Sequence, residues 1–383
     1  MKRAYKWVAF ALCFALILLM GVEVVPLQDR AIVVGLAIDA DEDGYSVAAQ
    51  ILMPSDDDSK SSGYIISEAR SETLSGALTK ISEQSNLIVA MSHCNLVILG
   101  KGVIDRGAYY SLDYLIRNAY LSENALLLAS DGRAADILSA KTAYSETSSF
   151  YIQRALMEFG YYNDRTVRTI REFIVSQYTY NKANWLPIVT KRVAQSEEKP
   201  GTSGGGTESP EGSGEEQYVF DFSTTAVFRD GKYRFTLSQE GTTGLAYVNS
   251  VIEEGSVTVT DPETGDVYNC FIVKSRAKKS FEPDSLTATV EVRVKLILKE
   301  ILSESDIYVP EDVEPADSIR ALISEEIISD VVTAFETCRA DGVDIFDLYG
   351  GFYGEGGASW RDSGSENYLG KATLNVKTDI TFH

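Results

Sequence analysis

Residues 288–298 read Ala-Thr-Val-Glu-Val-Arg-Val-Lys-Leu-Ile-Leu, and apolar and polar side chains alternate along them. A period of two predicts a long antiparallel strand that buries one face and exposes the other. The segment from Ala372 to Phe382 repeats the pattern. Between these segments, apolar residues keep a helical spacing over more than five turns of ~3.6 residues: Ile319, Ile323, Ile327, Val331, Phe335 and Cys338. We therefore expect an antiparallel sheet crossed by a long amphipathic helix, an α+β arrangement.

The region that precedes this sheet alternates predicted strands with predicted helices. Residues 31–39 form a short apolar run typical of a buried strand, and the acidic turn at 41–44 leads to a hairpin partner at 45–53. Ser71 is the expected N-cap of a helix that carries Leu74, Leu78 and Ile81. Further strands are predicted at 95–99 and 125–129, and further helices at 110–118, 133–139, 150–159 and 166–176. This alternation predicts a mixed strand-and-helix layer domain.

A segment rich in Gly, Ser, Glu and Pro, Ala194–Gln217, has almost nothing to bury and predicts a flexible linker with an end-to-end distance of roughly 25–30 Å. After it, residues 220–228 and 233–237 flank an Asp-Gly turn and predict a hairpin. The expected organisation is a signal-like segment at 1–25, an N-terminal α/β domain at 27–193, the linker at 194–217 and a C-terminal α+β domain at 218–383.

The N-terminus carries Lys2, Arg3 and Lys6 before the charge-free run Trp7–Val22. Such a run is about 24 Å of helix at ~1.5 Å per residue, slightly short of the ~30 Å bilayer core. We expect an uncleaved signal-anchor that places the rest of the chain outside the cytoplasmic membrane. A conventionally cleaved signal peptide is the alternative. Leu19-Met-Gly21 resembles the start of a lipoprotein signal, but Val22 stands where the lipidated cysteine would be.

The net charge of the chain limits the kinds of partner that it is expected to bind. The chain holds 35 Lys and Arg against 56 Asp and Glu, a formal net charge of −21. Such an acidic chain is not expected to bind nucleic acid. It also gains nothing from anionic lipid headgroups, so any membrane attachment must come from the N-terminal segment.

The cysteines and histidines predict no active site. Cys94, Cys270 and Cys338 are expected to be buried free thiols, with a Cys270–Cys338 disulfide as the alternative. His93 and Cys94 are adjacent, so on a strand they point to opposite faces and cannot act together. The acidic run 56–58 lacks the spacing of a calcium loop. We therefore predict no catalytic, cofactor-binding or metal-binding residue and no enzymatic activity. A hydrolase that uses two carboxylates is the weakest alternative.

Residues 344–357 read Asp-Ile-Phe-Asp-Leu-Tyr-Gly-Gly-Phe-Tyr-Gly-Glu-Gly-Gly and mix aromatic residues with glycines. One interpretation is a loop that contacts a partner, because aromatic residues dominate interface energetics. The other is a connection between helix and strand whose aromatic residues fold back on the core. The pairs Tyr109-Tyr110 and Tyr161-Tyr162 are expected to pack helices, with an interface role as the less favoured alternative.

Several short motifs, in order along the chain, resemble the Ger(x)C family of spore germination proteins, the C subunits of nutrient germinant receptors. They are the strand and acidic turn of residues 27–54 with Asp39 and Gln50-Ile-Leu-Met-Pro54, His93-Cys-Asn-Leu-Val-Ile-Leu-Gly100, Leu112-Asp-Tyr-Leu-Ile-Arg117, Ala134-Ala-Asp-Ile-Leu138, Thr225-Ala-Val-Phe-Arg-Asp-Gly-Lys232, Val343-Asp-Ile-Phe346 and Trp360. Members of this family carry a lipidated cysteine after the Leu-x-Gly triplet, and Val22 excludes that lipid here.

The resemblance implies a non-enzymatic subunit on the outer face of the spore inner membrane, which assembles with two integral-membrane or membrane-associated receptor subunits. The alternative function is a membrane-tethered extracytoplasmic solute-binding protein. Such a protein would need a ligand cleft between its domains, and a flexible acidic linker is poorly suited to hinge closure.

Overall fold

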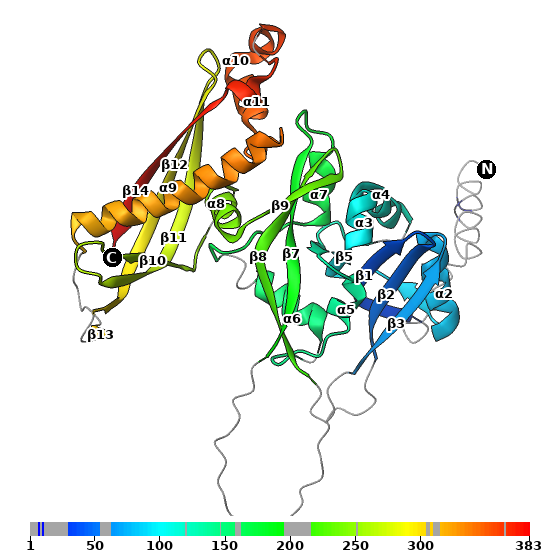
Figure 1. Ribbon diagram of the computed structural model, residues 1–383. Coiled ribbons are helices and arrows are strands. Elements are labelled where there is room, and N and C mark those ends of the chain that lie inside the picture. Colours follow the sequence, from blue (N-terminus) through cyan, green and yellow to red (C-terminus); the bar gives the residue numbers. More distant parts are fainter. Residues whose placement is uncertain are drawn as a thin grey trace, which may run out of the picture.

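The computed structural model of the protein describes residues 7, 10, 30–53, 63–118, 121–145, 147–157, 162–194, 216–249, 252–303, 307–308, 315–363 and 365–383. The described residues form two β-sheets with helices packed against them, which confirms the α+β class (Figure 1). The predicted signal-anchor and the acidic run 56–58 lie outside the described residues, apart from Trp7 and Phe10. No helix within the described part of the chain is both long and apolar enough to span a bilayer.

The first sheet runs in the order β3-β2-β1-β5-β6-β7-β8-β9, with β4 paired to β1. Its strands are β1 (Arg30–Asp41), β2 (Gly44–Leu52), β3 (Tyr64–Ser71), β4 (Ile88–Ala90), β5 (Leu96–Leu99), β6 (Leu126–Ser130), β7 (Ala183–Val193), β8 (Tyr218–Arg229) and β9 (Lys232–Leu237). The central strands β1, β5, β6 and β7 are parallel, and antiparallel hairpins flank them on both sides. The hairpins predicted at 31–53 and 220–237 are thereby confirmed.

Helices cover both faces of this sheet. One core contains residues of α2 (Leu74–Ser85), α3 (Lys101–Arg106), α4 (Ala108–Asn118) and α7 (Ile170–Ser176). The core on the other face contains residues of α5 (Ala134–Leu138) and α6 (Ser148–Met157). In β1, Leu36 and Ile38 belong to the first core and Ala37 to the second. A strand buried on both faces has no polar side, which explains the continuous apolar run at 31–39.

The second sheet is built around the alternating segment. It runs in the order β10-β11-β12-β13, and β14 pairs with β12. Its elements are β10 (Ser256–Thr260), β11 (Val267–Glu282), β12 (Thr287–Leu302), β13 (Ile307–Tyr308) and β14 (Thr373–Phe382), and the helix across it is α9 (Asp317–Ala340). The predicted inward faces are confirmed, because all six apolar residues predicted along α9 and those at 288, 290, 292, 294, 296 and 298 are buried.

One strand of this sheet differs from the antiparallel prediction. β14 pairs with β12 in parallel, with Thr287 opposite Thr373 and Leu296 opposite Phe382. The cause is the connection: α9 crosses the sheet between the two strands, and a helical crossover returns the chain in the same direction. The sequence alternation predicted the buried face of β14 correctly but carried no information on its direction.

The predicted linker does not coincide with the boundary between the sheets. Val193 at the end of β7 pairs with Tyr218 at the start of β8, and the amide of Ala194 donates to the carbonyl of Gln217 at 2.8 Å. Residues 195–215 lie outside the described part of the chain. The segment therefore joins the ends of two neighbouring strands of the first sheet, and the second sheet begins only with β10.

Two local predictions also differ from the structure. The N-cap of α2 is Thr73, whose hydroxyl accepts the amide of Gly76 at 3.1 Å, whereas Ser71 ends β3. The segment predicted as a loop or connection at 344–357 is largely helical, because α10 spans Leu348–Ser363 with a break at Gly357 (φ 61°). A short helix, α11 (Tyr368–Lys371), then leads into β14.

Helix α8 (Gln239–Asn249) joins the two sheets. The core of the second sheet includes Leu245 of α8 together with Ala183, Val227 and Leu237 from strands β7, β8 and β9 of the first sheet. Gly244 brings the backbone of α8 against that of α9, since a Cβ atom there would overlap the carbonyl oxygen of Asp330. The two sheets therefore share one continuous apolar core through α8.

We predict that Gly244→Ala lowers the free energy of unfolding by about 1–3 kcal/mol, because the backbones of α8 and α9 must separate to admit the methyl group. Gly354→Ala is the matched control: Gly354 also lies in a helix, α10, and a Cβ atom there would meet nothing within 4 Å. We expect the control to gain about 0.4–1 kcal/mol. Urea unfolding of both variants tests this, and equal stability of the two would contradict the close contact.

Candidate functional site

His93 and Cys94 lie in different environments although they are adjacent in the chain. His93 is exposed in the turn before β5, while Cys94 is fully buried and donates its thiol to the carbonyl of Leu96 at 3.3 Å. Burial raises the pKa of Cys94 to about 12, so the thiol stays protonated at neutral pH. Among the described residues, no three His, Cys, Asp or Glu side chains are grouped so that they could hold a metal ion.

The remaining described cysteines are structural. Cys270 on β11 and Cys338 on α9 are buried and free, so the alternative of a disulfide between them is wrong. Burial raises the pKa of Cys270 to about 11 and that of Cys338 to about 12. Both side chains belong to the apolar core of the second sheet, as expected for small buried thiols.

The segment after α9 is organised by the buried carboxylate of Asp344. It accepts the backbone amides of Leu348 and Tyr349, each at 2.8 Å, and the hydroxyl of Tyr368 at 2.8 Å. The two amides belong to the first turn of α10, where N–H groups have no partner within the helix. Asp344 therefore caps α10 and fixes the position of α11 at the same time.

The aromatic residues of this segment mostly fold back on the core. Phe346 stacks on Phe335 of α9 with ring centroids 6.0 Å apart. Tyr349 contacts Trp360 and Tyr368 at centroid distances of 5.2 and 5.5 Å, and all three rings are at least half-buried. The interpretation as a folded-back connection thus holds for these residues. Tyr353, which is 41% exposed, is stacked parallel to Tyr349 with ring centroids 6.3 Å apart.

A loop of the first sheet reaches this aromatic cluster. Tyr180, in the loop between α7 and β7, stacks on Tyr349 with centroids 3.7 Å apart and planes 10° apart. The next residue, Asn181, donates its amide to the carbonyl of Asp344 and to the carboxylate of Asp347, both at 3.1 Å. The loop is therefore tied to α10 by a ring stack and by hydrogen bonds.

The same loop continues to α4. Tyr178 and Tyr109 join their hydroxyl groups at 3.1 Å, and the Tyr109 ring contacts that of Tyr110 edge to face. Tyr110, Tyr178 and Tyr180 are 79%, 75% and 67% exposed. We call these three residues the tyrosine surface. Tyr110 does not pack between helices as predicted, whereas Tyr109 is half-buried.

Charged groups of both signs surround the tyrosine surface. A cavity of about 440 Å³ beside Tyr110 and Tyr178 is also lined by Arg106, Lys182 and Lys232. Lys182 is paired with Asp230 at 2.8 Å. Aromatic rings with polar tips among mixed charges can bind a protein partner, since tyrosine supplies a large contact area at low entropic cost.

Comparison with known proteins places the chain in a family. The family model described as "Spore germination protein N-terminal domain" matches residues 23–191, and "Spore germination B3/GerAC like, C-terminal" matches residues 223–383. The chain belongs to the Ger(x)C family of spore germination proteins. A solved structure, titled "Crystal Structure of the GerBC protein", shares its fold, with 18% identity, a TM-score of 0.50 and coverage of 91% of this chain and 96% of that one. No curated protein matches the chain significantly.

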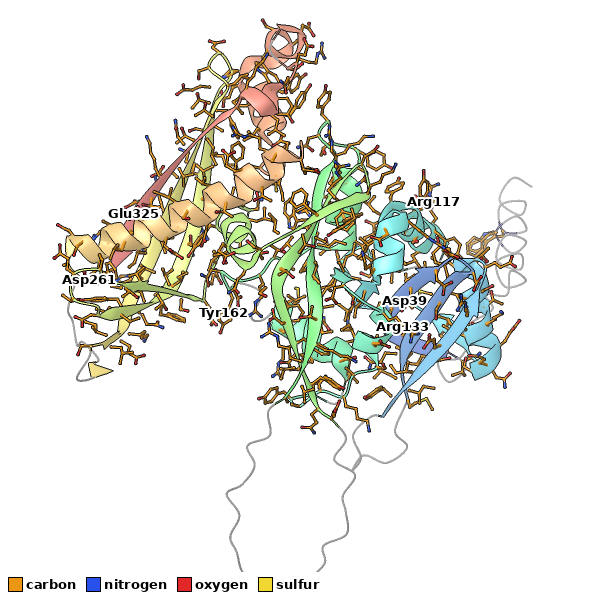
Figure 2. All side chains as sticks on the ribbon, in the orientation of Figure 1. Asp39, Arg117, Arg133, Tyr162, Asp261 and Glu325 are labelled. Carbon is orange, nitrogen blue, oxygen red and sulfur yellow. The ribbon has the colours of Figure 1, made fainter. Side chains whose placement is uncertain are left out.

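The residues that carry the Ger(x)C resemblance have structural roles in this chain. Asp39, at the end of β1, accepts the amides of Ala134 and Ala135 at 2.7 and 3.0 Å and so anchors α5 to the parallel strands. It lies beside Arg133 (Figure 2). Burial raises the pKa of Asp39, and the two amides oppose that shift. Gly100 allows this approach, because a Cβ atom there would overlap the Asp39 carboxylate.

Two further motif residues of the Ger(x)C chain join elements through buried hydrogen bonds. Gln50 on β2 is fully buried, donates to the hydroxyl of Ser148 at 3.3 Å and accepts the amide of Ser149 at 3.2 Å. Thr225 on β8 shares hydrogen bonds of 3.1 Å with the hydroxyls of Thr166 and Thr242. Buried polar groups with partners in separate elements specify how those elements meet.

We predict that Asp344→Ala lowers the free energy of unfolding by about 2–4 kcal/mol, because it removes the cap of α10 and leaves buried N–H and O–H groups without an acceptor. Asp362→Ala is the matched control, since Asp362 is an exposed partner of Arg361 on the same helix. A surface ion pair contributes about 0–1 kcal/mol, so the control should be nearly neutral. Equal urea midpoints for the two variants would refute the role assigned to Asp344.

Proposed function

We propose that this Ger(x)C protein is the C subunit of a spore nutrient germinant receptor and that it acts by docking to membrane-bound partner subunits without catalysing a reaction. Membership of the spore germination family supports the receptor role. The observation that carries the docking proposal is the tyrosine surface, in which Tyr110, Tyr178 and Tyr180 expose between 67% and 79% of their area. Large aromatic side chains that are exposed to solvent and held in place by a rigid support are typical of interface hot spots.

The support beneath the tyrosine surface favours tight docking. Tyr180 is held flat against Tyr349, and Tyr178 is held through its hydroxyl by Tyr109. Side chains that are already positioned lose less conformational entropy on binding, so more of their contact energy appears as affinity. The exposed rings all belong to the first half of the chain, while Tyr349 of α10 supports them from the second half.

Membrane attachment and the number of partners are part of the same proposal. The basic, then apolar, N-terminal segment would hold the folded part on the outer face of the spore inner membrane. Two membrane subunits of the receptor would then meet the tyrosine surface close to the lipid boundary. The net charge of −21 gives the folded part no attraction of its own to anionic lipids.

We predict that changing Tyr110, Tyr178 and Tyr180 together to Ala lowers the germination response to nutrients at least tenfold and abolishes co-purification with the membrane subunits of the receptor. Loss of a hot-spot residue costs about 2 kcal/mol or more, and the three lie in one surface. The strain should lack other germinant receptors, so that no paralogue masks the effect.

Tyr144→Ala is the matched control for this experiment. Tyr144 is 69% exposed, lies before α6 and stacks on Tyr151 of that helix instead of on any residue of the tyrosine surface. It should leave germination and co-purification unchanged. Thermal melting of the triple variant within a few degrees of the unchanged chain would show that it folds. An unaltered germination response in the folded triple variant would refute docking through this surface.

We also predict that spore membranes retain the chain in high salt and release it only with detergent, because apolar insertion rather than charge attaches it. A variant without residues 1–25 should remain in the soluble fraction. Immunoblots of the fractions measure this. Release of the complete chain by salt alone would contradict attachment through the N-terminal segment.

A further inference from the structure

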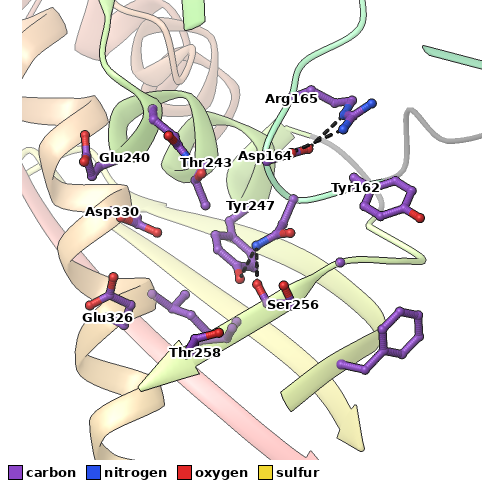
Figure 3. Close-up of a pocket in the computed structure, with 16 residues that line it drawn as sticks. Tyr162, Asp164, Arg165, Glu240, Thr243, Tyr247, Ser256, Thr258, Glu326 and Asp330 are labelled. Carbon is purple, nitrogen blue, oxygen red and sulfur yellow. Dashed lines mark hydrogen bonds and ion pairs between the residues drawn. The ribbon is translucent and has the colours of Figure 1, made fainter. Parts of the chain in front are cut away.

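A cleft separate from the tyrosine surface lies where α8, α9 and β10 meet the loop at 162–165 (Figure 3). Its volume is about 630 Å³, within the range of small-molecule sites. Acidic residues on α8 and α9 line one side, and Tyr162, Tyr247 and Phe271 supply aromatic surface. The chain segments that form it come from both halves of the protein.

Helix geometry brings three carboxylates to the acidic side of the cleft. Glu326 and Asp330 are four residues apart on α9 and therefore share one face of that helix. Glu240 is likewise four residues before Gly244 on α8, and Gly244 lies against the backbone of Asp330. The faces of α8 and α9 that approach each other thus both carry negative charge, although like charges repel.

Asp330 is the most constrained of these groups. It is only 8% exposed, and among the described residues the groups that act on its carboxylate are the like charges of Glu326 and Glu240, with no hydrogen bond or cation. Figure 3 shows it pointing from α9 into the cleft, towards Tyr247. A buried carboxylate without a partner is costly unless a positive group compensates it. Thr243, Ser256 and Thr258 also line the cleft, but their hydroxyl groups are uncharged and cannot neutralise Asp330.

The cation among the described residues that line the cleft does not supply that compensation. Arg165 lines the opposite side of the cleft, where its guanidinium pairs with Asp164 at 2.8 and 3.2 Å. It also lies 5.1 Å from the centre of the Tyr162 ring. Figure 3 shows this pair pointing away from Asp330. The side of the cleft formed by α8 and α9 therefore keeps an excess of negative charge.

We propose that this cleft binds a small organic cation, a protonated primary amine whose ammonium group pairs with Asp330 between Glu240 and Glu326. A metal ion fits less well, because the acidic side chains among the described residues are not grouped as metal ligands. An ammonium group offers three N–H donors to carboxylates and hydroxyls, and the aromatic walls can accept its apolar body. The inference is independent of the proposed docking function.

The charges around Asp330 also give the site a pH dependence. Burial, then Glu326 and Glu240, raises the pKa of Asp330 to about 7. A hydrogen bond from Ser238 lowers the pKa of Glu240, so that group stays ionised. Asp330 is therefore mostly neutral below about pH 7 and mostly charged above it. Amine binding should therefore be strongest above pH 7 and weaken as the pH falls through this value.

The test is calorimetric titration of the full chain, purified in detergent, with n-butylamine at pH 8 and constant ionic strength. We expect saturable binding that Asp330→Asn weakens at least tenfold. Glu325→Gln is the matched control: Glu325 is an exposed acid on the same helix but does not line the cleft. It should bind as the unchanged chain does. Tetramethylammonium, which has no N–H donor, should bind at least tenfold more weakly.

A second measurement separates loss of binding from loss of folding. Asp330→Asn removes an uncompensated buried charge, so its melting temperature at pH 8 should equal or exceed that of the unchanged chain. A lower melting temperature would mean that Asp330 has a structural partner and would overturn the proposal. Absence of saturable n-butylamine binding to the unchanged chain, or equal binding by Asp330→Asn, would overturn it as well.

Discussion

The carboxylate of Asp344 is the group on which the arrangement of the two halves depends. It is buried, caps α10 and holds Tyr368, and the same residue receives Asn181 from the first sheet through its backbone carbonyl. Burying a charged acceptor costs desolvation free energy. Removing one that satisfies several buried donors leaves those donors without a partner. Because its partners come from a loop of the first sheet, from α10 and from α11, it fixes the position of elements far apart in the sequence. Asp344 also accepts the amide of Tyr349, so it helps to position the ring on which Tyr180 stacks.

Local patterns predicted much of the fold because each reported a buried face. The alternation at 288–298 and the stripe along α9 both correspond to core residues. The direction of β14 could not be predicted, since alternation specifies a face but not a partner strand. Helix α8 was not predicted, because its glycines and threonines are weak helix formers and its stability comes from packing between the sheets. The composition of Ala194–Gln217 indicated a linker but could not show that the strands on either side of it pair.

The candidate site was predictable only in part for the same reason. The aromatic composition of 344–357 drew attention to Tyr349, yet nothing local indicated that Tyr178, Tyr180 and Asn181 would reach α4 and α10. Their meeting is a property of the tertiary fold. The motif residues Asp39, Gln50, Thr225 and Asp344 follow one rule: each places a polar side chain at a junction between elements. The Ger(x)C motifs in this chain therefore mark positions at which a polar side chain connects separate secondary-structure elements.

Both candidate interaction sites combine the two halves of the chain, so their shape depends on the rigidity of the junction. The exposed rings of the tyrosine surface belong to α4 and the loop before β7 and are supported by the buried ring of Tyr349. The cleft is formed by the loop at 162–165 together with α8, α9 and β10. The most direct test of docking is hydroxyl-radical footprinting of the receptor in spore inner membranes, compared with the purified chain. The account predicts that Tyr110, Tyr178 and Tyr180 are protected in the membrane while Tyr144 is oxidised equally in both. Equal oxidation of all four tyrosines would contradict it.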